Sequence, residues 1–413
     1  MLLAKYKNTF TFTFTMLLLS SQVAANDDLQ FSGFATLGVV YSDSDNYGYR
    51  KHVGSDSAVY AGEADFKQHS LLGLQADWAI SSSFDAVYQG VLRDLPEPSF
   101  DRYTTLAFLR YQVNPNWTIR LGRTAPDIFL LTEYRDVDFS YIWATAPNEV
   151  YGIIPYRSID GLDVSYNQRL LGGIFTAKVF TGSSESEVSA GTLVQEINIE
   201  DVVGLSLSFD HFDWVVNFKH SQISIANEPE SNAELSGIIR QVPDFLWTNS
   251  KNFTQSLLMK GEELTYSSIS AQYQWHNWLA TTELAQINSD SDVLRQINSG
   301  YAALSYQLSD HHLYSIYAFT NSDRYYYDEP GVNEVALKEL IHITTDFMNF
   351  YAANQHTISL GWRWDINSYL ASSLQWNYTS IEEAGGSPLW LSPTDYKAAE
   401  DVNTFLFTLS MVY

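Results

Sequence analysis

Apolar and polar residues alternate along much of this chain, which predicts β-strands because successive side chains of a strand point to opposite faces. The last ten residues, 404–413, show the pattern most clearly. Thr404, Thr408 and Ser410 share one face of this segment. The opposite face is apolar and consists of Phe405, Phe407, Leu409, Met411 and Tyr413. A similar strand is predicted at residues 29–41.

Tight turns separate the predicted strands at regular intervals. Each turn lies between two alternating segments, which is the sequence pattern of a β-hairpin. The seven turn centres lie near residues 81–83, 114–116, 167–172, 210–211, 276–277, 309–311 and 365–368. Seven hairpins contribute fourteen strands, and the first and last strands bring the number to sixteen. An even number of strands closes an antiparallel barrel in a single bacterial chain.

Long connections alternate with these turns. They lie near residues 42–67, 94–102, 125–160, 182–201, 221–265, 288–299, 321–354 and 379–403. Short turns at one end and long loops at the other are typical of a transmembrane barrel with periplasmic turns and extracellular loops. The pattern therefore predicts an all-β fold, a transmembrane antiparallel β-barrel of sixteen strands with both termini in the periplasm. Taken alone, the last segment would also fit an edge strand of a soluble protein.

The aromatic residues favour the membrane barrel over a soluble sandwich. Eight of them lie near the short turns, on the faces that carry aliphatic side chains: Trp78, Trp117, Trp214, Trp275, Trp278, Tyr306, Trp362 and Trp364. Aromatic rings with a polar edge belong at the boundary between water and lipid. The opposite faces are polar, as at Gln75 and Asp77 or Asn217 and Lys219. Such side chains enclose water in a barrel of this size, so the sequence predicts a channel.

The amino terminus has the pattern of a secretory signal peptide. Lys5 and Lys7 precede an uncharged stretch at residues 10–19, and small residues that suit cleavage end at Ala25. The apolar stretch is short for a transmembrane helix, so a cleaved leader is favoured over a retained anchor. We expect a signal peptide at residues 1–25 and one barrel domain at residues 26–413.

Composition narrows the classes of function. Removing Lys5 and Lys7 with the leader leaves 21 basic residues against 48 acidic ones, a net charge of −27. Such acidity argues against nucleic acid as a partner. The chain has no cysteine, so disulfide and thiolate chemistry are excluded. Aromatic residues make up 15% of the chain and charged residues 17%, and this balance without a long apolar run fits a transmembrane barrel.

Two segments resemble the Gram-negative outer-membrane porin superfamily. The last strand, apolar on one face and aromatic at its end, is similar to the assembly signal of those barrels, although they usually end in Phe and this chain ends in Tyr413. Gly122-Arg123, with Pro126 shortly after, resembles the entry to the constriction loop of porins with this strand number. The resemblance implies that the third loop, residues 125–160, folds into the pore.

The same resemblance implies a location and partners. We expect an integral barrel in the outer membrane of a Gram-negative cell, inserted by the barrel-assembly machinery. Outer-membrane lipid and lipopolysaccharide are the expected surroundings, and a homotrimer is the expected assembly. The acidic loop tips, such as Glu382 and Glu383, are interpreted as a solvated surface, with a divalent-cation bridge to lipopolysaccharide phosphates as the alternative.

The third loop and nearby strands supply a candidate pore constriction. The loop carries an apolar share that suits packing against a barrel wall rather than exposure to water. The candidate residues are Arg93, Arg110, Arg120, Arg123, Asp127, Glu133, Arg135, Asp136, Asp138 and Glu149. Loop carboxylates facing wall guanidinium groups would set a transverse field that orders water and penalises apolar solutes. Alternatively, the arginines only hold the loop in place, and the two roles are compatible.

A search for catalytic and metal-binding patterns finds none. No serine and histidine are placed on neighbouring strands so as to indicate a nucleophile and its base, and His311-His312 lacks further metal ligands. No phosphate-binding or dinucleotide motif is present, so no enzyme activity, metal or cofactor is expected. Residues 336–341 have helical propensity within the seventh long loop.

The expected function is a porin for passive diffusion of small hydrophilic solutes and ions. Loop carboxylates and wall arginines are nearly balanced in number, whereas acidic outer loops raise the cation concentration at the mouth over about 10 Å at 0.1 M salt. This predicts a weak cation preference that fades as salt rises. A substrate-specific sugar or anion channel, or a surface receptor that uses its long loops, stays open as the alternative.

Overall fold

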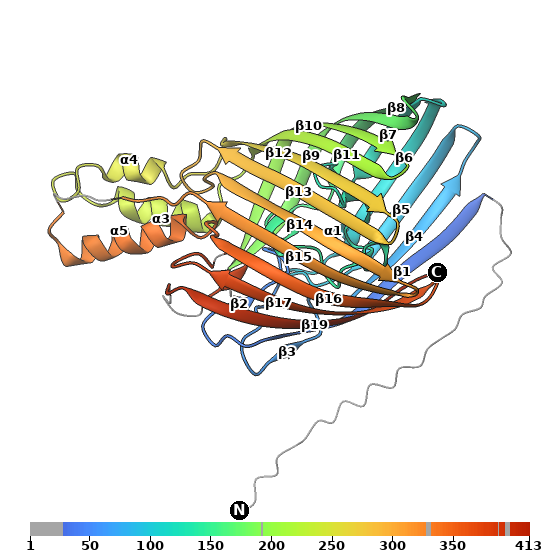
Figure 1. Ribbon diagram of the computed structural model, residues 1–413. Coiled ribbons are helices and arrows are strands. Elements are labelled where there is room, and N and C mark those ends of the chain that lie inside the picture. The colour runs from blue at the N-terminus through green and yellow to red at the C-terminus, as the bar shows by residue number, and fades with distance from the viewer. Residues whose placement is uncertain (1–27, 191–192, 328–331, 387, 393–396) are drawn as a thin grey trace, which may run out of the picture.

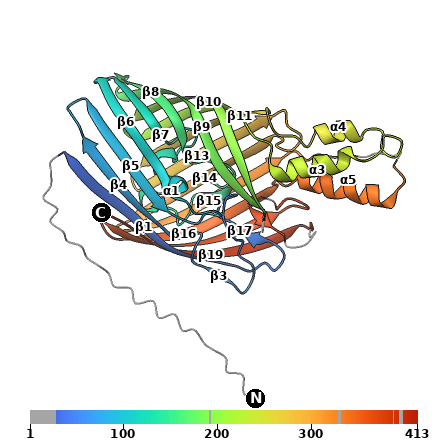
Figure 2. The ribbon, with the colours of Figure 1, turned by 180° about the vertical axis from the view of Figure 1, so that it is seen from behind.

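A computed structural model describes residues 28–190, 193–327, 332–386, 388–392 and 397–413, so the expected signal peptide lies outside the described residues. Sixteen antiparallel strands close into one barrel, which Figures 1 and 2 show from opposite sides. The barrel strands are β1 (Leu29–Ser42), β4 (Leu71–Ala79), β5 (Phe84–Leu92), β6 (Thr104–Asn114), β7 (Trp117–Thr124), β8 (Ile159–Leu170), β9 (Gly173–Ala190), β10 (Leu193–His211), β11 (Trp214–Ile225), β12 (Glu263–Trp275), β13 (Trp278–Ser289), β14 (Ile297–Leu308), β15 (His311–Ser322), β16 (Gln355–Asn367), β17 (Leu370–Ile381) and β19 (Glu400–Val412).

The first and last strands close the barrel. Strands β1 and β19 pair antiparallel, and the backbones of Gly33 and Tyr413 exchange hydrogen bonds of 3.1 and 3.0 Å. Seven short turns join the strands at the end where the carboxyl terminus lies (Figure 1). In one of them, Leu171 and Gly172 have φ of 51° and 82°, as two-residue hairpin turns require. The prediction of sixteen strands with seven tight hairpins is confirmed.

Outward-facing side chains form an apolar belt around the barrel. Leu74, Leu121 and Ile269 lie within their strands and are each more than half exposed. Near the short turns the exposed side chains are aromatic: Trp78, Trp117, Trp214, Trp275, Trp278 and Trp364. Aliphatic residues between aromatic boundaries form a lipid-facing surface, and a closed barrel leaves no backbone edge unpaired in lipid. The chain is an integral barrel of the Gram-negative outer membrane.

The longer connections lie at the opposite end of the barrel. A short helix, α1 (Phe100–Tyr103), precedes β6, while α3 (Glu230–Arg240) and α4 (Ser250–Gln255) lie between β11 and β12. Helix α5 (Val335–Met348) confirms the helix predicted at residues 336–341. Helices α3, α4 and α5 project together beyond the barrel in Figure 1. Among the described residues, no helix is long and apolar enough to cross a membrane.

The first loop, residues 43–70, folds back over the barrel mouth. Strand β2 (Gly48–Tyr49) pairs with β18 (Trp390–Leu391) of the last loop, and β3 (Ala64–Asp65) pairs with β1. Arg50 is fully buried and donates hydrogen bonds to the carbonyl oxygens of Val53, Ser55 and Pro388. The first and last loops therefore form one structure.

The prediction of a long loop near residues 182–201 is wrong. Strand β9 extends to Ala190 and β10 begins at Leu193, and the two strands pair with one register shift between Ile199 and Val202. The Ser and Glu composition there predicts a loop, but Val188 and Ile197 are buried. The amide of Ser189 also donates to the carbonyl oxygen of Val53 at 3.0 Å. This tertiary support extends the strands beyond the length that the local composition indicates.

The third long loop fills much of the barrel interior. This loop, named L3 and comprising residues 125–158, contains η1 (Thr132–Tyr134), η2 (Asp138–Ser140) and α2 (Asn148–Tyr151). The side chains of Ile128 and Phe129 are at most 2% exposed. The ring of Phe129 lies 5.6 Å from that of Tyr266 on β12, and Trp143 lies 5.5 Å from Tyr301 on β14.

The prediction of a lumen that encloses only water is therefore wrong on one side of the barrel. From β11 to β17, L3 and the inward side chains form a dry core, which includes Tyr266, Tyr301 and Tyr314. Strand alternation identifies which residues point inward. It does not reveal that a loop from another part of the chain will pack on them.

Candidate pore constriction

Loop L3 is held in the barrel by a buried carboxylate. Glu283 on β13 accepts a hydrogen bond of 3.0 Å from the amide of Leu130 and one of 2.6 Å from the hydroxyl of Tyr151. The side chain of Glu283 is fully buried. A buried carboxylate is stable only when such donors satisfy it, so Glu283 fixes two distant points of L3 at once.

The later part of L3 contacts strands β15 to β17. The amide of Ala144 donates to the hydroxyl of Tyr314 at 2.9 Å, and Arg363 donates to the carbonyl oxygen of Tyr141. Glu149 accepts from Nε2 of Gln355 at 2.9 Å and from the hydroxyl of Thr357. The structure thus places Glu149, a candidate constriction residue, against the far wall and away from the candidate arginines.

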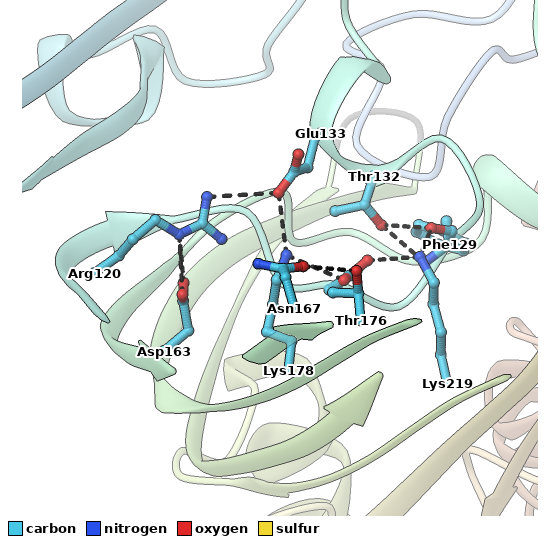
Figure 3. A network of polar contacts seen from close by, with 10 residues as sticks. Arg120, Phe129, Thr132, Glu133, Asp163, Asn167, Thr176, Lys178 and Lys219 are labelled. Atoms are coloured by element: carbon cyan, nitrogen blue, oxygen red, sulfur yellow. Dashed lines mark hydrogen bonds and ion pairs between the residues drawn. The ribbon is translucent and has the colours of Figure 1, made fainter. Parts of the chain in front are cut away.

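A chain of alternating charges joins L3 to strands β7, β8 and β9 (Figure 3). Nε of Arg120 lies 2.8 Å from a carboxylate oxygen of Asp163, which is almost completely buried. A second guanidinium nitrogen of Arg120 lies 3.5 Å from Glu133 in L3. Glu133 in turn lies 3.1 Å from Nζ of Lys178 on β9. Half of the Glu133 side chain stays exposed, so this network borders a solvent-filled space.

Asp127 at the start of L3 binds two lysines of the barrel wall. Its carboxylate lies 2.6 Å from Nζ of Lys219 on β11 and 3.1 Å from Nζ of Lys178. Burial opposes ionisation, but the two ammonium groups outweigh it and hold the pKa of Asp127 below its usual range. Lys178 likewise lowers the pKa of Glu133, against the effect of burial. Both loop carboxylates are therefore charged at neutral pH.

A second charged group surrounds Asp136 of L3. Arg157 donates a hydrogen bond to Asp136, and Arg93 and Arg135 lie near enough to act on the same carboxylate. Burial raises the pKa of Asp136, and these three guanidinium groups lower it further than burial raises it. Arg135 also donates to the carbonyl oxygen of Tyr151 and lies over the ring of Phe129. Positive charge therefore exceeds negative charge at this point.

Arg123, the last candidate arginine of β7, lies on the barrel wall between two carboxylates. Its guanidinium group is 2.7 Å from Asp160 on β8 and 3.0 Å from Asp101 in α1. Nη1 also donates to the carbonyl oxygen of Asp101 at 2.8 Å. These contacts tie the second loop to the strand that leads into L3.

Besides Arg123, three candidate residues are not part of either charged group. Arg110 on β6 is paired with Asp85 at 2.9 Å, and its side chain is 43% exposed. Asp138 is buried and accepts a hydrogen bond from the hydroxyl of Tyr141, and Glu149 binds the far wall. The structure brings together Arg93, Arg120, Arg123, Asp127, Glu133, Arg135 and Asp136 along one side of L3.

Sequence reasoning missed Lys178, Lys219 and Glu283. All three lie at inward positions of their strands, and the sequence places Lys219 on the polar inner face beside Asn217 without indicating a partner in L3. The only sign of such a residue in the sequence is a lysine or glutamate at an inward position of a strand far from the third loop. What the sequence lacked was the path of L3, which carries Asp127 across the barrel to Lys219.

A polar cavity of about 510 Å³ opens beside this charged wall. It is lined by the first three loops and by strand ends from β4 to β10. Its basic lining residues are Lys51, Arg93, Arg102, Arg123 and Arg157. Its acidic lining residues are Asp94, Asp101, Asp136, Asp160, Glu185, Glu187 and Glu200. Five positive and seven negative side chains leave a net charge of −2.

One serine and one histidine, which the sequence did not single out, lie within hydrogen-bond distance on neighbouring strands. Nδ1 of His220 on β11 lies 2.9 Å from Oγ of Ser267 on β12. Both residues lie on the outward-facing side of their strands, where His220 is exposed. In the described part of the chain, His220 has no recorded contact with a carboxylate that would orient it as a base. No group of three or more potential metal ligands occurs among the described residues either.

Comparisons with known proteins identify the architecture. No protein-family model matches the chain, and no curated protein matches it. The outer membrane channel DcaP of Acinetobacter baumannii superposes with a TM-score of 0.55 at 10% identity, over 94% of this chain and 99% of DcaP. An OmpF of Salmonella typhi in complex with daunomycin gives 0.52 at 11% identity, over 93% of this chain and 97% of OmpF.

A third solved structure has the same architecture. OmpT of Vibrio cholerae lacking loop L8, an outer membrane protein, superposes with a TM-score of 0.52 at 12% identity, over 93% of this chain and 99% of that one. The chain has the closed-barrel fold of outer-membrane porins and channels. Identities this low show the shared fold, and the function must be argued from the residues of this chain.

Proposed function

We propose that the chain is an outer-membrane porin through which small hydrophilic solutes and ions diffuse passively. The observation that carries this proposal is the position of the polar cavity. The dry core fills the interior beside β11 to β17 and reaches β9 and β10 toward the loop end, at Val188 and Ile197, whereas the polar cavity is lined by the first three loops and strand ends from β4 to β10. The side that L3 leaves unfilled is thus the side with charged walls.

The proposed solute path runs along β7. A solute that leaves the polar cavity passes Arg123 and Asp136, and then Arg120 and Glu133 nearer the short turns. Carboxylates of L3 and guanidinium groups of the wall would set a transverse field there. The proposed constriction consists of Arg93, Arg120, Arg123, Asp127, Glu133, Arg135 and Asp136. Anchoring L3 and shaping the field are joint roles of these ion pairs.

We expect a weak cation preference. The polar cavity has a net charge of only −2, so strong selection at the narrowest point is not expected. The acidic surface of the loops concentrates cations at the mouth within about a Debye length, near 10 Å at 0.1 M salt. Because salt screens this surface field, the preference should fade as ionic strength rises.

Assembly and partners follow the same proposal. Phe405, Phe407, Leu409 and Met411 face outward on β19, and the exposed Tyr413 follows that strand. A receptor of the assembly machinery can bind side chains in these positions. We propose that these residues are the assembly signal, that a signal peptide at residues 1–25 directs export, and that the barrel forms a homotrimer surrounded by lipid and lipopolysaccharide. No catalytic role is proposed, because the Ser267 and His220 pair lacks an orienting acid among the described residues.

Conductance in planar bilayers and solute uptake by liposomes test the proposal together. Purified protein should produce discrete conductance steps, and liposomes that contain it should swell in small sugars at rates that fall with sugar size. Glu133→Lys should shift the ion preference toward anions. Glu339→Lys on the exposed face of α5 makes the same charge change away from the path and should have little effect. Barrels that insert into the bilayer but do not conduct ions would refute the proposed porin function.

A further inference from the structure

The inward face of several strands changes from polar to aliphatic toward the loop end of the barrel. On β11, Asn217 and Lys219 are followed by Ile223 and Ile225. The same change on neighbouring strands brings in the side chains of Ile197, Ile199, Leu264, Ile287 and Ile297. These residues and the L3 segment 153–156 enclose a pocket of about 90 Å³, named here the apolar pocket. A general path for hydrophilic solutes has no need of such a lining.

The apolar pocket is suited to an apolar group. Its volume exceeds the roughly 10–15 Å³ that one water centre needs, but a stable buried water also needs two to four polar partners. Nearly all of its lining is aliphatic or aromatic. Protein interiors are otherwise close-packed, so an unfilled aliphatic pocket inside a barrel is a feature that a ligand can use.

The apolar pocket adjoins the polar cavity. Pro155, Tyr156 and Ile199 line both. At this boundary the carbonyl oxygen of Ile154 lies 2.8 Å from Nε2 of His52 and 3.5 Å from Nη2 of Arg135. The positively charged side chain of Arg135 therefore contacts the L3 segment that forms the aliphatic wall, and Arg157 directly follows Tyr156 in that segment.

The charge at this boundary favours an anion. Arg93, Arg135 and Arg157 all act on Asp136. Glu187 and Glu200 also line the polar cavity beside the boundary, and Glu187 is paired with Arg102 at 2.5 Å. Nη1 of Arg93 is buried and has no hydrogen-bond partner in the described part of the chain. A carboxylate is the group that best satisfies a guanidinium nitrogen, because the hydrogen bond is charge-assisted. The excess is local, since the whole cavity carries a net charge of −2.

We propose that the two cavities form one binding site for a small amphipathic carboxylate taken up from the medium. The carboxylate binds Arg93 beside Arg157, and its alkyl or aryl part occupies the apolar pocket across Tyr156. The proposal rests on the porin function and deepens it, because such a site retains one class of solute at the mouth while other small solutes pass. Segment 153–157 of L3 is the wall that both halves share.

Binding of straight-chain carboxylates tests the proposal. Butyrate, hexanoate and octanoate are added to the loop side of single channels in bilayers, and the same series is titrated calorimetrically into detergent-solubilised protein. Each added methylene should tighten binding about threefold to fourfold until the pocket is full. Hexylammonium and hexanol should bind at least tenfold more weakly than hexanoate, because neither can pair with Arg93.

Variants separate the two halves of the site. Arg93→Gln should remove the preference for hexanoate over hexanol. Ile223→Thr with Ile287→Thr, which replace the ethyl group of each side chain with a hydroxyl, should flatten the dependence on chain length. Ile343→Thr on the exposed face of α5 is the matched control and should change neither property.

Several outcomes would overturn the site. Equal affinities for butyrate and octanoate would exclude the apolar pocket, and equal affinities for hexanoate and hexylammonium would exclude the arginine head-group site. Open-channel conductance is measured before any ligand is added, so failure of the porin function is seen separately. Because calorimetry needs no current, absence of binding there would overturn the proposed site even in a barrel that does not conduct.

Discussion

Nζ of Lys219 on β11 lies 2.6 Å from the carboxylate of Asp127 at the start of L3. These residues are 92 positions apart in the chain, and their contact carries the loop from β7 across the barrel. Lys178 supports the same carboxylate at 3.1 Å. Removing one partner of a buried pair leaves an uncompensated charge, which typically costs about 3–5 kcal/mol.

We predict that Lys219→Met destabilises the barrel by about 1–3 kcal/mol, less than that full cost because Lys178 remains beside Asp127. The denaturant midpoint of the folded barrel in detergent measures the change. Lys251→Met removes an exposed pair with Asp244 and should cost less than about 1 kcal/mol. Equal effects of the two variants would show that Lys219 does not hold L3.

The Glu283 anchor predicts a change in channel noise. Glu283→Gln keeps the size of the side chain but replaces one of the two carboxylate oxygens, which accept hydrogen bonds from the Leu130 amide and the Tyr151 hydroxyl, with an amide nitrogen. L3 should then fluctuate, and single-channel recordings should show more frequent transitions between conductance levels. Glu263→Gln, at an exposed position of β12, is the control. Recordings from Glu283→Gln that match the wild type would contradict an anchoring role.

The loop carboxylates predict a specific dependence on pH. Lysine partners lower the pKa of Asp127 and of Glu133 in the folded protein. A lowered folded-state pKa contributes stability that is complete above the unfolded-state value, near 4, and is lost as pH falls through the folded-state value. The stability that these two carboxylates contribute should hold steady from about pH 7 to 5 and decline below about pH 4. Asp127→Asn should make that acid decline shallower, as denaturant midpoints across this range will show.

The closing strand predicts a defect in assembly. Tyr413 lies beside Gly33 on β1, and a Cβ added at Gly33 would come within 2.3 Å of the Tyr413 ring. Deleting residues 405–413 should abolish insertion into the outer membrane, whereas Tyr413→Phe should leave it intact. Membrane fractions examined for heat-modifiable barrel provide the measurement. A normal amount of folded barrel after the deletion would exclude this strand as the assembly signal.

Much of the fold could be predicted because strand alternation and turn residues are local signals. The outward rows of Leu and Trp and the seven turns fix the strands, and the apolar face of residues 404–413 identifies the closing strand. The continuation of β9 and β10 could not be predicted, because contacts with Val53 of the first loop support it. Its own Ser and Glu residues indicate a loop.

The candidate site was predictable only in part. The entry at Gly122 and Arg123 located L3, and the loop carboxylates Asp127 and Glu133 do meet basic side chains of the wall. Glu149 has the same chemistry but lies against Gln355 on the far wall, because the path of L3 decides which residues meet. Position along a loop does not show which wall a side chain will reach.

The reversal potential in a tenfold KCl gradient tests the central claim most directly. Single channels are recorded at low and at high total salt with the same gradient. A charged but nearly balanced passage between L3 and the β4 to β10 wall predicts a weak cation preference at low salt that declines at high salt. A strongly anion-selective channel, or a preference for cations that high salt leaves unchanged, would contradict this account of the constriction.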